Sequence, residues 1–341
     1  KNMITKKNIL LTGAGFSANF GGLLAREMWS KILSNPKMDA IPQIREILKK
    51  DFDFESVYSS VKNSGVHTQG DKEIFQEIVL ESYCLMDNYL KEYSQSSYDK
   101  SGMHFGNFRN WLDVFKGAGE EVGAHFTLNQ DLLIERETRI VPLGLGTSGN
   151  GVYIEKITSA TRQIDHRVEV KLPNEASLEE FKTTYLSSNG NFCYIKLHGS
   201  IGWLSHDGQS QLILGTNKLE DIKKEPLLKW YFDLFNEAIS RSGVRLFVIG
   251  YSFRDDHVND LIMRAINEYN LEIYIISPEH PESLKNRLEG KKDSCSGYEV
   301  LPTNKIWEAV YGYFPYSLRE IFPSHQTGTG VYFDIQRNLL K

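Results

Sequence analysis

Cysteine is scarce in this chain, and its scarcity excludes two kinds of structural site. The 341 residues include three cysteines, Cys84, Cys193 and Cys295, which lie far apart in the sequence. No two of them form a CxxC pair, so the sequence supports neither a structural zinc ribbon nor a disulfide framework. We therefore expect no metal-ligating residues and a reducing, cytoplasmic location.

Long apolar runs and an excess of positive charge are also missing. No apolar run approaches the length that spans a membrane, so no membrane partner is expected. The formal net charge of −5 argues against a broad surface for direct nucleic-acid binding. Lysines precede the apolar run at 9–11 as in a signal peptide, but Thr12, Ser17 and Asn19 interrupt that run, so we expect none. The lysine at position 1 leaves open whether the chain is trimmed or part of a longer protein.

A second strand near residue 35 is absent as well. A Rossmann dehydrogenase places such a strand there and ends it in an acidic residue that binds the ribose. Here residues 35–120 show helical periodicity instead, with the longest helix expected at 71–93. The aromatic residues at 103–115 recur at helical spacing and indicate packing rather than a binding surface. The pattern counts against a dehydrogenase and predicts a helical insertion.

A strand followed by a glycine-rich turn is present near the start of the chain. The apolar run at 9–11 leads into Gly13 and Gly15, and a helical pattern begins near Leu23. Together with Ala18, the two glycines fit the loose GxGxx(G/A) dinucleotide fingerprint. Free N–H groups at a helix start would favour a pyrophosphate. An ordinary glycine-rich turn between a strand and a helix is an equally good interpretation.

Two later strands end in polar residues. The strand near 122–128 leads into Asn129, Gln130 and Asp131, and the strand at 192–197 leads into His198. The carboxyl ends of parallel strands border the ligand crevice of an open α/β sheet, so both segments are candidates for chemistry. An Asx turn or helix N-cap would explain the first cluster equally well. A histidine at a strand end suits acid–base work, although a single histidine is more often structural.

Strands and helices alternate over the rest of the chain. Strands are expected at 245–249 and 272–276, each followed by polar residues. This alternation predicts an α/β fold, with a Rossmann-like doubly wound parallel sheet. The helical insertion occupies about 35–120, and a small inserted module about 141–190. We assign residues 1–300 to one catalytic domain and 301–341 to a C-terminal tail that packs on it.

Four of these segments together resemble one family, the sirtuins, and most closely its divergent prokaryotic NAD-hydrolase branch. The family's GAG(I/V)S loop, which holds NAD phosphates, is similar to Gly13-Ala14-Gly15-Phe16-Ser17, and its TQNID motif is similar to Thr127-Leu128-Asn129-Gln130-Asp131. The HG(S/T) motif, which carries the catalytic histidine, is similar to His198-Gly199-Ser200. The GTS turn, which contacts the cofactor, is similar to Gly250-Tyr251-Ser252. The segments keep the family's order along roughly residues 8–280.

The departures from the family pattern concern the acylated peptide and zinc. Deacetylase sirtuins usually carry four zinc-binding cysteines after the histidine, and this chain has none of them. Gly21 and Arg26 match the glycine and arginine of the family's GIPDFR segment, but Leu24 stands in place of the aspartate. Leu128 replaces the glutamine of the TQNID motif. These changes argue against recognition of an acetyl-lysine peptide.

The resemblance implies an NAD glycohydrolase that uses NAD as its substrate, needs no zinc, and releases nicotinamide and ADP-ribose. It assigns catalytic roles to Asn129, His198 and Asp131. The implied cofactor-binding residues are Gly13, Ala14, Gly15, Ser17, Arg26, Gly250, Ser252 and Ser277.

The resemblance also implies a biological setting. Sirtuin-like proteins of this pattern serve as effectors of anti-phage defence, where they deplete NAD. A homo-oligomer is expected, together with a second defence protein such as an ATPase, an Argonaute-like protein or a phage-sensing subunit. Two alternatives stay open, a zinc-free NAD-dependent protein deacylase and a non-catalytic module for nucleotide sensing or assembly.

Overall fold

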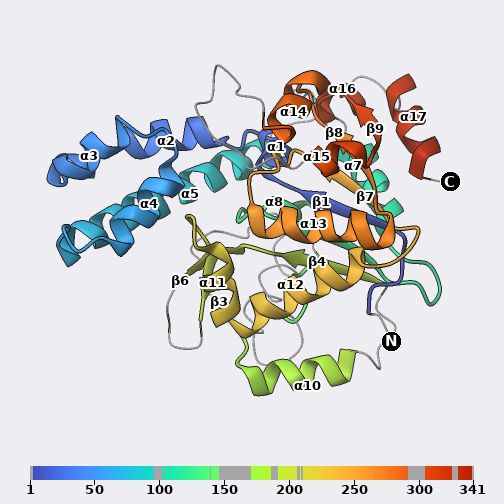
Figure 1. The fold of residues 1–341 in the computed structure, drawn as a ribbon, viewed down its shortest axis with the longest axis horizontal. Helices are drawn as coiled ribbons and strands as arrows, with labels where there is room; N and C mark the ends of the chain where they lie inside the picture. Colours follow the sequence, from blue (N-terminus) through green and yellow to red (C-terminus); the bar gives the residue numbers. More distant parts are fainter. Residues whose placement is uncertain are drawn as a thin grey trace.

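The chain is built around a six-stranded parallel sheet (Figure 1). The computed structural model describes residues 3–95, 102–103, 105–138, 140–145, 170–185, 191–205, 208, 210–290, 304–324 and 329–339. In spatial order the strands are β4 (Phe192–Lys196), β2 (Gly123–Thr127), β1 (Asn8–Thr12), β7 (Arg245–Ile249), β8 (Glu272–Ile276) and β9 (Val310–Phe314). All five neighbouring pairs are parallel, which confirms the predicted doubly wound α/β sheet.

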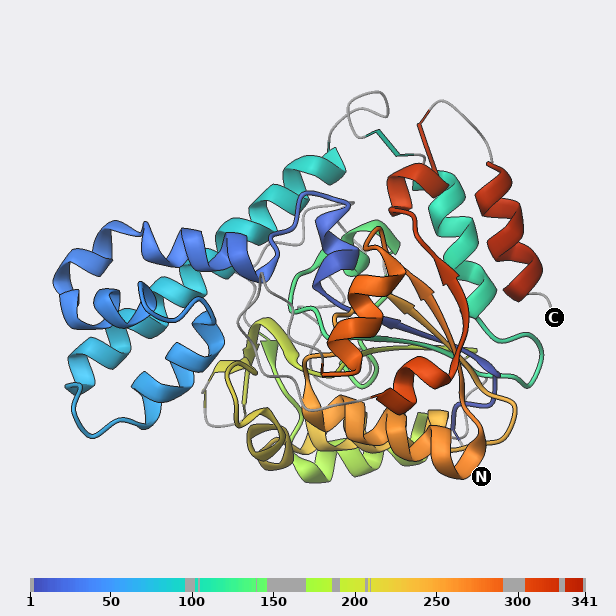
Figure 2. The ribbon, with the colours of Figure 1, turned by 45° about the horizontal axis from the view of Figure 1, so that its top comes forward.

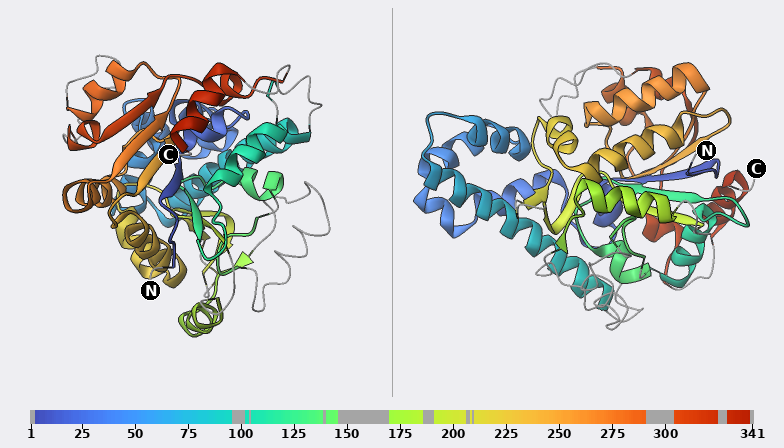
Figure 3. Two further views of the ribbon diagram at one scale, coloured as in Figure 1. Left: turned by 90° about the vertical axis from the view of Figure 1, so that its right-hand side faces the viewer. Right: turned by 90° about the horizontal axis from the view of Figure 1, so that it is seen from below.

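Two helical layers cover the sheet, because successive side chains of each strand point to opposite faces. Ile9 and Leu11 of β1 pack into one apolar core and Leu10 packs into another. The first core is completed by α10 (Glu175–Tyr185), α12 (Pro226–Ile239), α13 (Asp256–Tyr269), α14 (Pro281–Leu288) and α15 (Asn304–Glu308). The second is completed by α1 (Ala14–Ala18), α7 (Phe105–Leu112), η2 (Asp113–Phe115), α8 (Leu133–Thr138), α16 (Leu318–Ile321) and α17 (Gly330–Leu339). Figure 3 shows the sheet between the two layers.

The strand order reverses at β1. From β1 the chain continues to β2 and β4 on one side, and later returns to β7, β8 and β9 on the other side. Open α/β sheets bind their ligands at such a reversal, outside the carboxyl ends of the strands. The topology therefore points to the ends of β1 and β7, at Thr12 and Ile249.

A helical arm projects from one end of the sheet (Figure 2). We use this name for residues 25–95, which form α2 (Ala25–Leu33), η1 (Pro36–Ala40), α3 (Pro42–Leu48), α4 (Phe54–Asn63) and α5 (Gln69–Gln95). The arm has its own apolar core, in which Met28, Val57 and Phe75 are buried. Ile201 and Leu214 join this core from outside the arm, so the arm is packed against later parts of the chain. The helices predicted in this region are present.

A second, three-stranded sheet lies beside the arm, and α11 (Lys218–Lys224) follows its last strand along the chain. Its strands are β3 (Val170–Lys171), β5 (Gly199–Leu204) and β6 (Ser210–Leu212), in the order β3-β5-β6. β3 and α10 belong to the small module predicted at about 141–190. Of that module, 146–169 and 186–190 lie outside the described residues.

The segment 301–341 contributes more than surface helices. Its strand β9 pairs in parallel with β8 and forms one edge of the central sheet. The last helix, α17, is held by side chains of β1 and β7. Asn8 Nδ2 donates to the carbonyl of Leu339 at 2.8 Å, and Arg245 donates to the carbonyl of Asn338 at 2.7 Å. Two elements of the C-terminal segment are therefore integrated with β1, β7 and β8.

Candidate active site

Two glycine-containing turns cross at the ends of β1 and β7. The Gly13 N–H donates to the carbonyl of Ile249 at 3.0 Å, and the Gly15 N–H donates to that of Gly250 at 2.9 Å. A Cβ on Gly13 would lie 2.8 Å from the Gly250 oxygen, and a Cβ on Gly15 would lie 2.8 Å from the Gly250 Cα. The glycines thus allow the two main chains to touch. Their N–H groups, which the sequence assigned to a pyrophosphate, bond the β7 turn, and α1 begins directly at Ala14.

We expect Gly250→Ala to destabilise the fold strongly. Gly250 has a φ of 64°, and a Cβ there would overlap the main chain of Gly15 and Phe16. Strain and overlap together should cost about 2–5 kcal/mol of unfolding free energy. Urea unfolding would measure the loss against Gly65→Ala, because a Cβ at Gly65 meets no atom within 4 Å. Equal midpoints for the two variants would contradict this role for Gly250.

Asn129 and Asp131 join the β1 turn through Ser17. Asn129 Nδ2 donates to the carbonyl of Gly13 at 3.0 Å and to Ser17 Oγ at 2.9 Å. Ser17 Oγ in turn donates to Asp131 Oδ2 at 2.7 Å. No described residue donates a hydrogen bond to Asn129 Oδ1. Asn129 as a whole is 8% exposed, so solvent reaches part of it. The amide oxygen of Asn129 is therefore the part of this network that can meet a ligand.

Asp131 also has the structural role that the sequence left open. Its Oδ1 accepts the N–H of Leu133 at 3.0 Å, which forms an Asx turn at the start of α8. Burial raises the pKa of the Asp131 carboxyl, and the Lys196 ammonium and the Ser17 hydroxyl offset only part of that effect. Asp131 thus ties α1 to α8.

The segment 127–131 is bonded to the segment that carries His198. The N–H of Leu197 donates to the carbonyl of Thr127 at 2.9 Å. The carbonyl of Gln130 accepts from Ile201 N–H at 3.0 Å and from Ser200 Oγ at 3.1 Å. These bonds hold the end of β2 against the start of β5, so the Asn129 and His198 segments are adjacent.

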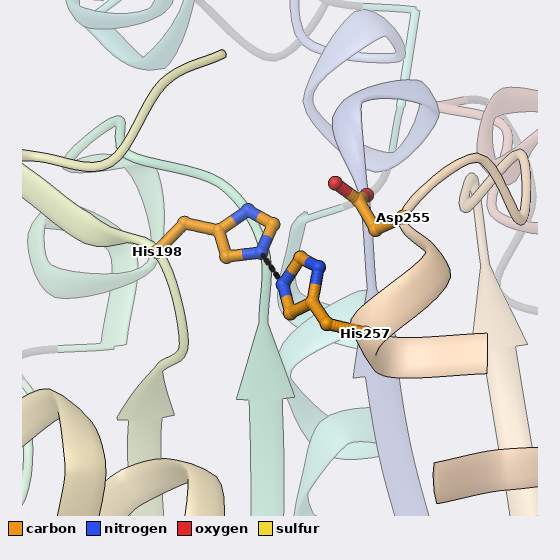
Figure 4. Close-up of side chains that lie close together, drawn as sticks. All are labelled: His198, Asp255 and His257. Atoms are coloured by element: carbon orange, nitrogen blue, oxygen red, sulfur yellow. Dashed lines mark hydrogen bonds between the residues drawn. The ribbon is translucent and has the colours of Figure 1, made fainter. Parts of the chain in front are cut away.

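His198 forms a close group with two residues from the start of α13. His198 Nε2 lies 2.9 Å from His257 Nε2, and Asp255 turns its carboxylate toward the two rings (Figure 4). Ligand atoms of the three side chains all lie within 4.8 Å of one another. Burial lowers the pKa of His198 well below 6.5, although the Asp255 carboxylate opposes this effect. His198 is therefore neutral at pH 7.

A buried lysine links this group to the helical arm. Lys218 Nζ lies 2.6 Å from Asp255 Oδ1 and 2.7 Å from Glu55 Oε2, and Glu55 belongs to α4. Burial lowers the pKa of Lys218, but the two carboxylates raise it more, so Lys218 stays charged. Burial raises the pKa of Asp255, yet Lys218 and His198 lower it further, to below its usual value. The ionised Asp255 therefore faces the histidine pair.

Most of the segments that form this site fall within the part of the chain that matches a known family. A family model described as a SIR2-like domain matches residues 124–295, half of the chain. The chain belongs to the SIR2-like domain family. No curated protein matches it. SIR2-like domains are NAD-dependent enzymes, so the activity of this SIR2-like chain is NAD-related. Asn129, His198 and His257 lie inside the match, and the glycine-rich β1 turn precedes it.

The remaining predicted cofactor residues of the SIR2-like chain lie at or near strand ends. Ala14 and Ser252 are exposed in the turns that follow β1 and β7. Ser277 is half-buried after β8, where its hydroxyl accepts the N–H of Glu279 at 3.3 Å. Arg26 is exposed in the first turn of α2. Three successive turns along the sheet edge thus offer polar groups or open main chain, which suits an elongated dinucleotide.

Sequence reasoning missed part of the polar group around the histidine. One signal was present in the sequence, because Asp255 and His257 follow the β7 turn within a few residues. No sequence signal indicated that Lys218 and Glu55 join them, since they come from α11 and from the distant arm.

No helix among the described residues has both the length and the apolar character needed to cross a membrane.

Among the described residues, His198, Asp255 and His257 are the one group whose ligand atoms could converge on a metal ion. Two imidazoles and a carboxylate are suitable ligands for zinc. However, the Lys218 ammonium already pairs with Asp255 at 2.6 Å. A divalent cation would meet this positive charge beside its only anionic ligand, which disfavours tight binding.

We therefore expect the purified SIR2-like chain to contain no stoichiometric zinc. The ion pair of Lys218 with Asp255 is the reason, together with the absence of any CxxC pair in the sequence. Elemental analysis of the metal-to-protein ratio tests this, with activity measured before and after incubation with a chelator. One tightly held zinc per chain, or loss of activity with the chelator, would contradict the expectation and favour a deacylase.

Proposed function

We propose that this SIR2-like chain is an NAD glycohydrolase, which cleaves NAD to nicotinamide and ADP-ribose. The observation that carries the proposal is the hydrogen-bonded connection between the β1 turn, Asn129 and the His198 segment at the strand-order reversal. Membership of an NAD-dependent family supplies the substrate class.

The sheet edge fits NAD along the turns after β1, β7 and β8. Gly13 is buried where the two turns cross, but Ala14 is exposed and Gly15 and Gly250 are partly exposed, and this part of the main chain has almost no side chains to keep a pyrophosphate away. Ser252 and Ser277 offer hydroxyl groups further along the same edge, and the exposed Arg26 offers positive charge. Ser17 is committed to Asp131, so its contribution is to hold Asn129 in place.

The reaction needs little from the protein beyond positioning and one base. The oxygen of a water molecule bonds to C1′ of the ribose as the C1′–N bond breaks. Nicotinamide leaves with the electron pair of that bond and becomes neutral. Asn129 Oδ1 accepts a hydrogen bond from the water or a ribose hydroxyl, and His198 takes the proton that the water loses. Asp131 holds the β1 turn and the start of α8 together through its hydrogen bonds to Ser17 and Leu133.

Release of nicotinamide from NAD tests the proposal directly. The purified chain would be incubated with NAD alone, and in parallel with NAD and an acylated peptide. Release without peptide supports the glycohydrolase. Release that requires the peptide and yields deacylated product favours the deacylase. NAD binding without release would identify a non-catalytic module.

We further propose that the enzyme is an effector of anti-phage defence, held back until it assembles. A cytoplasmic enzyme that freely hydrolysed NAD would harm its own cell. Five of the seven exposed large apolar side chains among the described residues lie between positions 24 and 85, which suits an interface on or beside the arm. Glu55 connects this arm to Lys218 and so to the histidine group. Assembly of identical chains, or docking of a second defence protein, could thereby alter the site.

Activity per chain should depend on protein concentration. We expect turnover per chain to fall on dilution, together with the mass measured by light scattering, because an assembly that contacts the arm would act on the site through Glu55 and Lys218. Leu80→Lys provides a test on the arm itself, since Leu80 lies on α5 and is 37% exposed. A monomer that hydrolyses NAD at the full rate without a partner would exclude gating by assembly.

A further inference from the structure

The contact between His198 and His257 constrains where their protons lie. Two ring nitrogens at 2.9 Å form a hydrogen bond only if one of them carries a hydrogen and the other does not. In a neutral pair, either His198 Nε2 donates to His257 or His257 Nε2 donates to His198. The two arrangements differ in the chemistry that remains for His198.

Only one arrangement leaves His198 with a basic nitrogen. If His257 donated to Nε2 of His198, the proton of neutral His198 would sit on Nδ1 and no lone pair would be free. If His198 donates through Nε2, its Nδ1 is unprotonated. Nδ1 lies on the side of the ring away from His257 (Figure 4), and no described residue bonds it.

We propose that His257 is a positioning residue, which accepts the Nε2–H of His198 and so keeps Nδ1 of His198 unprotonated as the base. This inference rests on the proposed function, in which His198 takes a proton from water. His257 need not touch NAD, because it acts through His198.

The structure holds the His257 ring in one place. His257 is the second residue of α13, whose start is braced by Tyr251. The Tyr251 hydroxyl donates to Asn259 Oδ1 at 2.9 Å and accepts the N–H of Asp255 at 3.3 Å. The ring of Phe232 packs against His257 with 5.6 Å between centroids. A ring held in this way fixes the position of the hydrogen-bond partner of His198 Nε2, and the hydrogen bond at one ring nitrogen sets the protonation of the other.

Charges around the pair suit a base that takes one proton. When Nδ1 of His198 accepts a proton, the positive charge extends over a ring that donates to His257 and faces ionised Asp255. Asp256, also at the start of α13, adds a smaller favourable effect on His257. Lys218 opposes the charge but is itself paired with Asp255 and Glu55. Asp255 thus offsets part of the cost that burial imposes on a transient imidazolium at His198.

Nitrogen NMR of the intact wild-type chain tests the tautomer without any activity assay. Chain labelled with ¹⁵N-histidine is compared with His198→Gln to assign the His198 signals. We expect His198 to carry its hydrogen on Nε2 at pH 8. Protonation on Nδ1 would overturn the proposal. Because this readout needs no turnover, it decides the role of His257 even if the wild type releases no nicotinamide, a result that would refute the proposed function alone.

Kinetics of two His257 variants give the second test. His257→Phe keeps a ring but removes the acceptor, so kcat should fall about 10- to 1,000-fold with KM within about twofold. His257→Gln restores an acceptor at similar reach and should recover most of kcat. His67→Phe is the matched control, since His67 lies in the loop between α4 and α5. Wild-type kcat in folded His257→Phe, or no recovery in His257→Gln, would overturn the role.

Discussion

Replacing His198 by alanine is expected to lower the rate of NAD cleavage by about 100- to 10,000-fold, the usual contribution of a general base. His198 is 2% exposed and its ring contacts His257, so the variant leaves a small cavity and an unpaired histidine rather than a disrupted sheet. Nicotinamide release would be measured on a variant whose urea unfolding midpoint shows that it is folded. Partial rescue of His198→Ala by added imidazole would support a role in proton transfer.

The pH dependence of the wild type provides an independent check. A base must be unprotonated to act, and burial lowers the pKa of His198 well below 6.5. The ratio kcat/KM, which reports ionisation of the free enzyme, should therefore stay constant from pH 8 down to 6.5 and fall only in more acidic solution, as His198 becomes protonated. Near-wild-type turnover by folded His198→Ala, or an inflection near pH 6.5 that persists in that variant, would refute this role.

Replacing Asn129 by alanine is expected to abolish most NAD cleavage while NAD binding stays measurable. The variant removes Oδ1, the atom that we assign to the reacting water or ribose hydroxyl. It also removes two donated hydrogen bonds, to the Gly13 carbonyl and to Ser17 Oγ. Their loss should cost about 1–3 kcal/mol of unfolding free energy. Nicotinamide release gives the turnover, and calorimetry gives the NAD affinity.

Asn19→Ala is a matched control for the structural part of this effect. Asn19 Nδ2 also donates to the β1 turn, at the Gly15 carbonyl, with a distance of 2.9 Å. If loosening of the turn explained the loss of turnover, Asn19→Ala would show a similar loss. We expect it to keep turnover within about threefold, as a substitution that removes no reacting contact. Loss of NAD binding in step with turnover in Asn129→Ala would make Asn129 a binding residue instead.

Much of the scaffold follows from local sequence patterns. The apolar runs at 9–11, 245–249 and 272–276 are buried strands, because such runs between helical segments suit a sheet covered on both faces. Polar residues after those runs lie at the carboxyl edge for the same topological reason. The spacing of apolar residues at 71–93 likewise gave α5, since a helical period needs no information from the rest of the chain.

The details of the site are different, because they depend on contacts between distant segments. The sequence by itself determined that Asn129, Asp131 and His198 follow strands, and that Gly13 and Gly15 occupy a turn. Only the tertiary structure showed that these glycines leave room for the main chain of Gly250 to approach closely.

The tertiary structure also determines which residues contact His198 and its neighbours. His257 lies 59 residues further along the chain, and Glu55 reaches Lys218 from the helical arm. Local propensity and periodicity describe neighbours within a few residues, whereas these groups meet because the fold brings α13, α11 and the arm together, where Lys218 pairs with Asp255 and Glu55. The candidates Asn129, Asp131 and His198 could therefore be named from the sequence, whereas the hydrogen bonds and ion pairs around them depend on the fold.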